Sequence, residues 1–448
     1  MINNNFKLKY NCLNIKHQQK KQIFDIVDDY YRLLDDKVQS IKDKKSFEYE
    51  SELPGYLIAI GEGCDLFADQ QKWIDNAYTL LSHLKTNIKE NPDYPISFFY
   101  GLSEIAYGTM IISTKTGHFN RFLSSLNVHM SNIFKQHLAQ IDGLNGDTRM
   151  ECFDVIFGFA GIGRYLLSYV KYYKMYQDCE VEETMLKKII KYFIELSEDK
   201  IVNGKKIVKF HVSSQNQFTE DEKIAYPNGN LDFGIAHGMA GPLALMSYAV
   251  QNGVVIDGQI DAIKKLIRLY DTHSFYEDQI LRWPTILSFD NYWEKDVSVN
   301  RYDKKMGWCY GSIGISRVLY IASQCVELES LKYLDNLKKI SQLPINKFNL
   351  VSPTLCHGYA GVLSILNLTY KENPKLVEMK KGIDSNLHQI LKCYDPSLKY
   401  GFRNVEFYET GLIEDESNTY LSGTTGIVLT LLSLLQSDSR HEEHLMIK

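Results

Sequence analysis

The sequence lacks any apolar run long enough to cross a membrane. Its longest apolar run, residues 427–435, is interrupted by Thr430 and Ser433 and is far shorter than the roughly 20 residues that a spanning helix needs. Residues 1–21 are polar throughout, so they lack the hydrophobic region of a secretory signal peptide. We therefore expect a cytoplasmic protein.

Cysteine and net charge are also low. Eight cysteines in 448 residues do not form a disulfide-rich chain, and in a reducing compartment metal binding or thiol chemistry is their better use. The net charge of −5 gives no electrostatic footprint for nucleic acid. The apolar content of 44 % is ample for a core, and helical repeats can extend into one large body.

The sequence does contain a repeated phrase: an apolar lead-in, then Gly-x-x-Gly, then a run rich in Leu, Ile and Val. The intervals are irregular, from 47 residues (Gly311 to Gly358) to 80 residues (Gly158 to Gly238). A sixth copy keeps its first glycine, Gly101, and has Glu104 in place of the second. Repeats of this kind set the fold. The intact copies are residues 158–161, 238–241, 311–314, 358–361 and 423–426.

Each copy predicts a tight turn that leads into a helix, because glycine tolerates positive φ and close backbone approach. The runs that follow are apolar on most faces, as in buried helices: residues 162–176, 242–251, 315–326, 362–370 and 427–436. The segments between them are amphipathic and charged, for example residues 183–198, 261–272, 329–342 and 376–393. Inner helices that alternate with outer helices predict an all-α fold, an α/α toroid formed as a single domain by residues 1–448.

Three parts of the chain differ from the repeats. Residues 1–95 predict helices at 19–41 and 70–89, around a Pro54-Gly55 turn and a loop at residues 61–63. The widest gap contains β-like residues around Asn203-Gly204, a strong hairpin signal, so we predict a small α/β insertion at residues 177–231. A long segment at residues 280–306 is either a substrate-contacting loop or an irregular surface excursion.

Aligning the copies on the first glycine predicts a metal site, because equivalent positions in a closed ring face the same central point. Cys309 and Cys356 share the position two residues before the glycine, and His357 lies one residue before it. Two thiols and an imidazole form the three-ligand set of a catalytic zinc, with the fourth position open. The alternative is that they are core residues, since a lone buried cysteine is usually a small hydrophobe.

Three further residues are candidates for catalysis. His237 occupies the ligand position of its copy, but Ala236 replaces the cysteine, so we expect a general acid or base instead of a ligand. Asp154 is expected either to orient that histidine or to cap a helix. Tyr310 is expected either to hydrogen-bond a reacting carbonyl or to pack.

At these residues the chain resembles the lanthionine synthetase C family, the stand-alone cyclases of class I lanthipeptide biosynthesis. The matching motifs are Ala236-His237-Gly238-Met239-Ala240-Gly241-Pro242, Trp308-Cys309-Tyr310-Gly311 and Cys356-His357-Gly358, with residues 153–161 upstream. The resemblance covers about residues 95–436. It implies a toroid with an insertion similar to an SH2 domain, and one zinc ion per chain held by Cys309, Cys356 and His357.

The resemblance also implies the reaction, a Michael-type intramolecular addition of cysteine thiols to dehydroalanine or dehydrobutyrine. The (methyl)lanthionine thioether rings would form in a dehydrated precursor peptide that carries a leader, with His237 and Asp154 protonating the enolate. The implied partners are a dehydratase and a transporter at the inner face of the membrane. One departure is that Lys304 and Lys305 precede the Trp-Cys-Tyr-Gly motif, where the family often has arginine; Arg301 lies further away, and lysine lacks the planar guanidinium fork.

Two alternatives stay open. Relatives of this family in eukaryotes are thought to add glutathione to dehydroamino acids in proteins with a similar zinc site. The other alternative is a zinc-stabilised helical scaffold that binds peptides without catalysis. A structural zinc usually has four protein ligands, so a closed fourth position would favour the scaffold.

Overall fold

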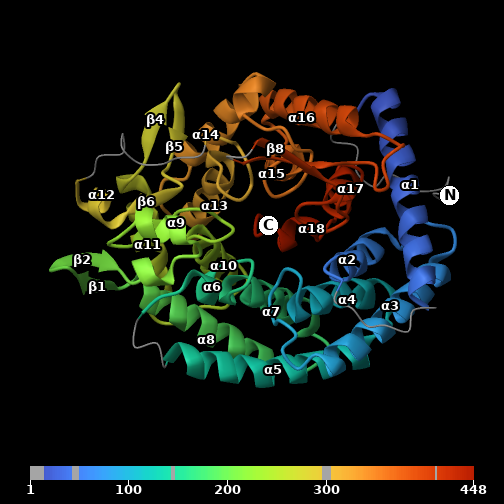
Figure 1. The fold of residues 1–448 in the computed structure, drawn as a ribbon, viewed down its shortest axis with the longest axis horizontal. Coiled ribbons are helices and arrows are strands. Elements are labelled where there is room, and N and C mark those ends of the chain that lie inside the picture. The colour runs from blue at the N-terminus through green and yellow to red at the C-terminus, as the bar shows by residue number, and fades with distance from the viewer. Residues whose placement is uncertain (1–14, 43–49, 143–146, 295–303, 409–410) are drawn as a thin grey trace. The chain divides into compact units, whose positions relative to one another are not determined.

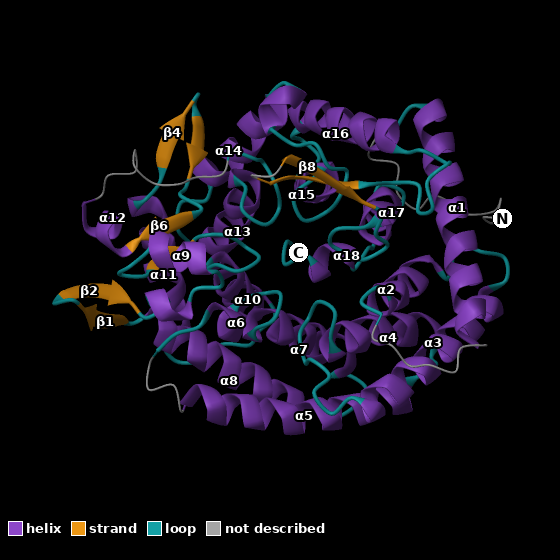
Figure 2. Ribbon diagram, in the orientation of Figure 1, coloured by secondary structure: helices purple, strands orange, loops and turns teal. Residues whose placement is uncertain are grey.

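The computed structural model describes residues 15–42, 50–142, 147–294, 304–408 and 411–448 (Figure 1). The chain separates into two compact units. The first unit comprises residues 1–95, 100–126 and 341–442, and the second comprises residues 96–99, 127–340 and 443–448. Helices dominate, and the strands, orange in Figure 2, are short. No helix within the described ranges is long and apolar enough to span a bilayer.

The first unit combines fully buried helices with helices that bury one face. Almost every residue of α2, α4 and α17 is buried, whereas α1, α3 and α16 bury only an apolar stripe. The bounds are α1 (His17–Lys42), α2 (Leu53–Gly63), α3 (Gln70–Glu90), α4 (Leu102–Thr116), α15 (Tyr359–Glu372), α16 (Lys380–Cys393), β7 (Asn404–Tyr408), β8 (Gly411–Asp415) and α17 (Thr424–Ser433). Helix α5 (Asn120–Asp142) contributes residues to both units.

The second unit shows the predicted alternation most clearly. Buried helices α7 (Phe159–Tyr173), α10 (Ala240–Gln251) and α13 (Ser312–Cys325) alternate with amphipathic α8 (Glu180–Ser197), α11 (Gln259–Thr272) and α14 (Leu331–Gln342). Short helices are α6 (Met150–Phe153), α9 (Glu220–Ala225) and α12 (Phe289–Glu294). Three antiparallel strand pairs join β1 (Asp199–Val202) to β2 (Lys205–Val208), β3 (Asn230–Asp232) to β6 (Ile286–Ser288), and β4 (Phe275–Glu277) to β5 (Ile280–Arg282).

The repeated glycines serve close approach and not positive φ. Gly158 has an extended backbone with φ −98° and ψ −168°, and a Cβ there would lie 2.5 Å from the backbone nitrogen of Asp154. A Cβ on Gly426 would lie 2.0 Å from the carbonyl oxygen of Tyr420. Helix α7 begins at Phe159, directly after the first glycine, so the second glycine of the phrase lies inside the first helical turn.

The expected turn at Pro54-Gly55 is wrong, because these residues lie in the first turn of α2. Proline suits the first turn of a helix, where its missing N–H costs no hydrogen bond. The expected loop at residues 61–63 is the last turn of the same helix. A Cβ on Gly61 would lie 2.7 Å from Ile111 Cγ2, and a Cβ on Gly108 would lie 2.6 Å from Leu57 Cβ. These glycines therefore permit close packing of α2 against α4.

The predicted hairpin in the insertion is confirmed. β1 and β2 pair antiparallel with Val202 opposite Lys205, and Asn203 and Gly204 both adopt positive φ, at 49° and 76°, as a two-residue hairpin turn requires. β3 near the end of the predicted insertion pairs with β6, which lies in the long segment after residue 280. The similarity to an SH2 domain stays a prediction. Arg301 lies outside the described residues, and Lys304 Nζ lies 4.0 Å from Glu277 Oε1.

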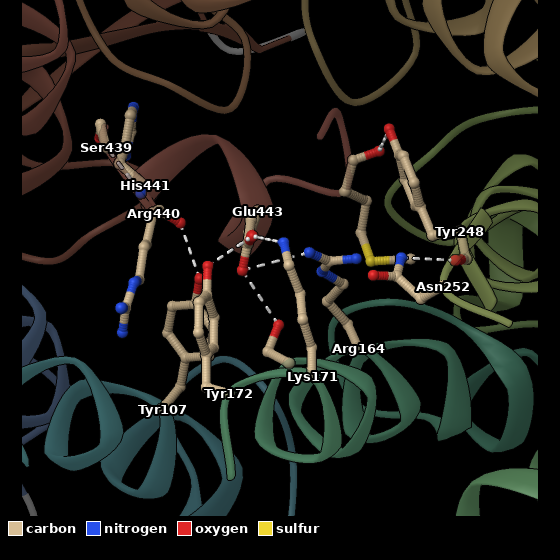
Figure 3. A network of polar contacts seen from close by, with 12 residues as sticks. Tyr107, Arg164, Lys171, Tyr172, Tyr248, Asn252, Ser439, Arg440, His441 and Glu443 are labelled. Carbon is tan, nitrogen blue, oxygen red and sulfur yellow. Dashed lines mark hydrogen bonds and ion pairs between the residues drawn. The ribbon is translucent and has the colours of Figure 1, made fainter. Parts of the chain in front are cut away.

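The C-terminal residues of the second unit are anchored by buried polar contacts (Figure 3). Glu443, at 0 % side-chain exposure, lies 3.3 Å from Arg164 and 2.8 Å from Lys171 of α7, and Tyr172 donates to it over 3.0 Å. The indole of Trp308 donates to the carbonyl oxygen of Leu445 over 2.8 Å. The chain end therefore supports the segment that carries Cys309.

Glu443→Gln is expected to lower the free energy of unfolding at neutral pH by on the order of 3 kcal/mol. Burial by itself would raise the pKa of the Glu443 carboxyl, but Arg164 and Lys171 lower it from 4.5 to about 2, and each pH unit corresponds to about 1.4 kcal/mol. Because the folded pKa is depressed, this stability is present above about pH 4.5 and is lost as the pH falls towards 2. The free energy of unfolding of the wild type and of Glu443→Gln is measured by denaturation across this pH range. Glu414→Gln, which changes an exposed ion pair, is the control. A difference that does not change with pH would contradict this assignment.

Candidate active site

Asp154 and His237 form the central pair of the candidate site in the second unit. His237 Nδ1 lies 2.6 Å from Asp154 Oδ2, with side-chain exposures of 24 % and 0 %. The other carboxylate oxygen, Oδ1, accepts hydrogen bonds of 2.7 Å from the backbone N–H groups of Phe157 and Gly158. Asp154 thus holds its own turn and also faces the histidine, so both interpretations of this residue are compatible. Donation from Nδ1 to the carboxylate selects the tautomer in which Nε2 can accept a proton.

Aromatic side chains surround the imidazole of His237. Phe157 stacks on it at a centroid distance of 6.1 Å, Phe218 meets it edge-on at 5.4 Å, and Tyr310 lies at 6.4 Å. Phe157 and Phe218 are 47 % and 45 % exposed. The histidine is therefore bordered by two phenylalanine side chains that are about half exposed. Phe218 belongs to the predicted insertion, and the sequence pattern gave no signal for it.

Asp232 is a second buried carboxyl near this pair that the repeat alignment missed. Its Oδ1 accepts a hydrogen bond of 2.7 Å from Gly234 N, and a Cβ on Gly238 would lie 2.3 Å from the same oxygen. Burial raises the pKa of Asp232 to about 6, although the Gly234 amide, His237 and the Tyr310 hydroxyl each lower it. The available sequence signal was its position five residues before His237, at the end of β3.

Asp232→Asn is expected to stabilise the protein at neutral pH by on the order of 3 kcal/mol, since the two pKa values differ by about two pH units. The pKa of this carboxyl is 3.8 unfolded and about 6 folded, so the favourable contribution of the protonated acid is present below about pH 4 and is lost as the pH rises to 6. Asparagine keeps the acceptor for Gly234 and cannot ionise. Unfolding free energies at about pH 4 and 7 check this, and a stability gain of equal size at both pH values would contradict it.

Cys356 and His357 lie together in the first unit, directly before α15. The backbone N–H of Cys356 donates to the carbonyl oxygen of Leu421 over 3.1 Å. His357 Nε2 lies 3.1 Å from both Asn404 Oδ1 and Glu406 Oε1. Burial by itself would lower the pKa of His357, but a hydrogen bond with the Cys356 side chain, together with Glu406 and Asn404, raises it. The two side chains thus have polar partners, which is compatible both with metal ligands and with hydrogen-bonded core residues.

Cys309 belongs to the second unit, where it is 8 % exposed and its carbonyl oxygen accepts a hydrogen bond of 2.8 Å from Ile235 N. Tyr310 follows it and is half-buried. Among the described residues, no group of three or more His, Cys, Asp or Glu side chains is placed so that it could hold a metal ion. The ligand set Cys309, Cys356 and His357 draws on both units, and it stays a prediction.

Comparison with known proteins assigns the family. Residues 51–446 match the family of lanthionine synthetase C-like proteins, and the chain belongs to that family. It is 26 % identical over 402 residues to the nisin biosynthesis protein NisC of Lactococcus lactis subsp. lactis, covering 87 % of each chain. A solved structure of nisin cyclase matches with a TM-score of 0.76 and 21 % identity, covering 96 % of this chain and 98 % of that one. The predicted α/α toroid is the fold of that structure and is confirmed.

Proposed function

We propose that this protein is a lanthipeptide cyclase, which joins cysteine thiols to dehydroalanine or dehydrobutyrine within one precursor peptide. The membership of the family and the similarity to a nisin biosynthesis protein and a nisin cyclase support this class of reaction. The observation that carries the proposal is the 2.6 Å contact between His237 and buried Asp154 among exposed aromatic side chains. This arrangement suits proton transfer beside a bound peptide.

The proposed reaction balances without any co-reactant. The thiol loses its proton, and the sulfur forms a bond to the β-carbon while the C=C electron pair moves to form an enolate. The α-carbon then takes up a proton, so the peptide gains and loses no atoms. His237 in its imidazolium form can deliver that proton from Nε2, and Asp154 stabilises the imidazolium through Nδ1. Tyr310, whose ring centroid lies 6.4 Å from that of His237, is proposed to hydrogen-bond the carbonyl oxygen where negative charge develops.

We also propose that one zinc ion per chain is held by Cys309, Cys356 and His357. The donor set fits zinc, which prefers thiolate and imidazole ligands. His357 fits as well, because its Nε2 is engaged by Asn404 and Glu406, which leaves Nδ1 as the nitrogen able to ligate. When bound, such an ion lowers the pKa of a thiol that takes its open position, so that a thiolate is available at neutral pH.

The need for a dehydrated substrate follows from the proposed reaction, whereas the leader and the transporter follow only from the resemblance to the family. The substrate is a dehydrated precursor peptide with its leader, and a dehydratase must act before this protein. We propose a cytoplasmic complex with that dehydratase and with a transporter at the inner face of the membrane.

The test is thiol consumption in a dehydrated precursor peptide. Ring closure does not change the peptide mass, but it removes thiols, so mass spectrometry after alkylation should show fewer adducts with the protein than without it. If the protein binds the peptide but the number of alkylated thiols does not fall, the cyclase proposal is overturned and the peptide-binding scaffold is favoured. Addition of glutathione to the peptide, when glutathione is supplied, without ring closure would favour the glutathione-transferring alternative.

A further inference from the structure

Two hydrogen-bond acceptors at the start of β7, in the first unit, lie next to the side chain of His357. Asn404 and Glu406 lie two residues apart on β7, so their side chains share one face of the strand. The strand pairs antiparallel with β8, with Asn404 opposite Asp415 and Glu406 opposite Ile413. Asn404 Oδ1 and Glu406 Oε1 each lie 3.1 Å from His357 Nε2. A single ring nitrogen therefore faces two oxygen atoms.

The hydrogen-bond network defines the orientation of the Asn404 amide. Its Nδ2 donates to Glu406 Oε1 over 3.0 Å, and Ser352 Oγ donates to its Oδ1 over 3.0 Å. The amide nitrogen thus points to the carboxylate and the amide oxygen to the histidine. Since a carboxylate and an amide oxygen can only accept, Nε2 must carry the proton. The lone pair of the neutral ring then lies on Nδ1.

Local burial keeps this arrangement in place. Asn404 is 7 % exposed and Ser352 is fully buried, and the backbone N–H of Val405 also donates to Ser352 Oγ over 3.3 Å. Further along the hairpin the side chains are open to solvent: Phe407 is 59 % exposed and Leu412 is 49 % exposed. The buried base of the hairpin is therefore the part that contacts His357.

We propose that Glu406 and Asn404 are positioning residues that hold His357 as the Nε2–H tautomer, so that Nδ1 is the atom that ligates zinc. The inference rests on the metal site of the proposed function and extends it to residues outside the repeated motifs. A histidine ligand whose second nitrogen donates to a carboxylate has a fixed ring orientation and higher basicity. Loss of such a partner typically weakens metal affinity by about 10–100-fold.

The test is zinc affinity, measured by competition with a chromophoric chelator at neutral pH. Glu406→Ala should weaken zinc binding by about 10–100-fold, whereas Glu406→Gln, which keeps an acceptor oxygen, should weaken it less. The matched control is Glu414→Gln, because Glu414 lies on the partner strand β8 and pairs with Arg403 at 3.0 Å. It should bind zinc as the wild type does.

A second readout reports the tautomer directly. Nitrogen-15 NMR of the histidine side chains in the metal-free protein should show His357 as Nε2–H in the wild type and as a tautomer mixture in Glu406→Ala. Wild-type zinc affinity in Glu406→Ala, or Nδ1–H in the wild type, overturns the inference and leaves the proposed cyclase intact. Absence of zinc binding in the wild type overturns both the inference and the metal site, and the thiol-consumption assay then reports separately on the reaction.

Discussion

Replacement of His237 by asparagine is expected to slow ring closure by about 10²–10⁴-fold, the usual contribution of a general acid or base. The asparagine amide can still donate to Asp154, which fills the role of Nδ1, but it offers no group that can carry a proton at the position of Nε2. The fold and the metal content should be unchanged, because His237 is not among the proposed ligands. Thiol consumption in single-turnover experiments, with zinc content measured on the same samples, is the measurement.

Two substitutions of Asp154 serve as its controls. Asp154→Asn keeps an oxygen for the N–H groups of Phe157 and Gly158, but it presents an amide N–H₂ to the histidine, which favours the opposite tautomer. The Asp154→Asn variant should therefore have the free energy of unfolding of the wild type but a lower rate of ring closure. Asp154→Ala removes both functions and should lose stability as well as rate. If Asp154→Asn closes rings at the wild-type rate, Asp154 serves only to cap its turn. If the His237 variant loses zinc, His237 is a metal ligand.

The repeated phrase predicted the helices well because both of its parts are local. An apolar run after a glycine pair determines where a buried helix lies, and the alternation of α7, α10 and α13 with α8, α11 and α14 follows from it. The helix starts were less accurate, since α7 begins at Phe159 and not at residue 162. Glycine was interpreted as a mark of turns, although at Gly61 and Gly426 it gives space to a neighbouring side chain or carbonyl oxygen. Such space depends on residues distant in sequence, which periodicity does not report.

In the candidate site too, residues within the repeated phrase could be predicted, whereas residues brought in by distant segments could not. Asp154, four residues before Gly158, and His237, one residue before Gly238, belong to the lead-ins of two copies of the phrase, and contact with this histidine was one of the two expectations for Asp154. Asp232 and Phe218 lie outside the aligned positions, and they reach the Asp154–His237 pair through strand β3 and the insertion. Glu406 of the first unit reaches His357 through strand β7. Pairing of short strands has a weak sequence signal, so the groups that support the repeat residues became evident only in three dimensions.

Cys356→Ala is expected to remove zinc from the protein and to abolish ring closure. With only two of three protein ligands left, metal affinity should fall steeply, and the loss of an ion worth several kcal/mol to the barrier corresponds to at least about 10³-fold in rate. The fold should persist, because the hydrogen bond from residue 356 to Leu421 uses the backbone N–H. Zinc per chain and thiol consumption are measured together. The control is Cys393→Ala, since Cys393 is a half-buried cysteine in the same unit but outside the ligand set.

The paired readouts separate three explanations. Loss of zinc together with loss of ring closure, with both retained in the Cys393 variant, is the result that the proposed site requires. Zinc retained in the Cys356 variant would mean that the ligand set inferred from the repeat is wrong, while Asp154 and His237 would keep their roles. Zinc lost with ring closure unchanged would mean that the metal takes no part in activating the thiol. The proton transfer between His237 and the peptide would then have to account for thiol ionisation too, and the rate should follow the protonation state of that histidine.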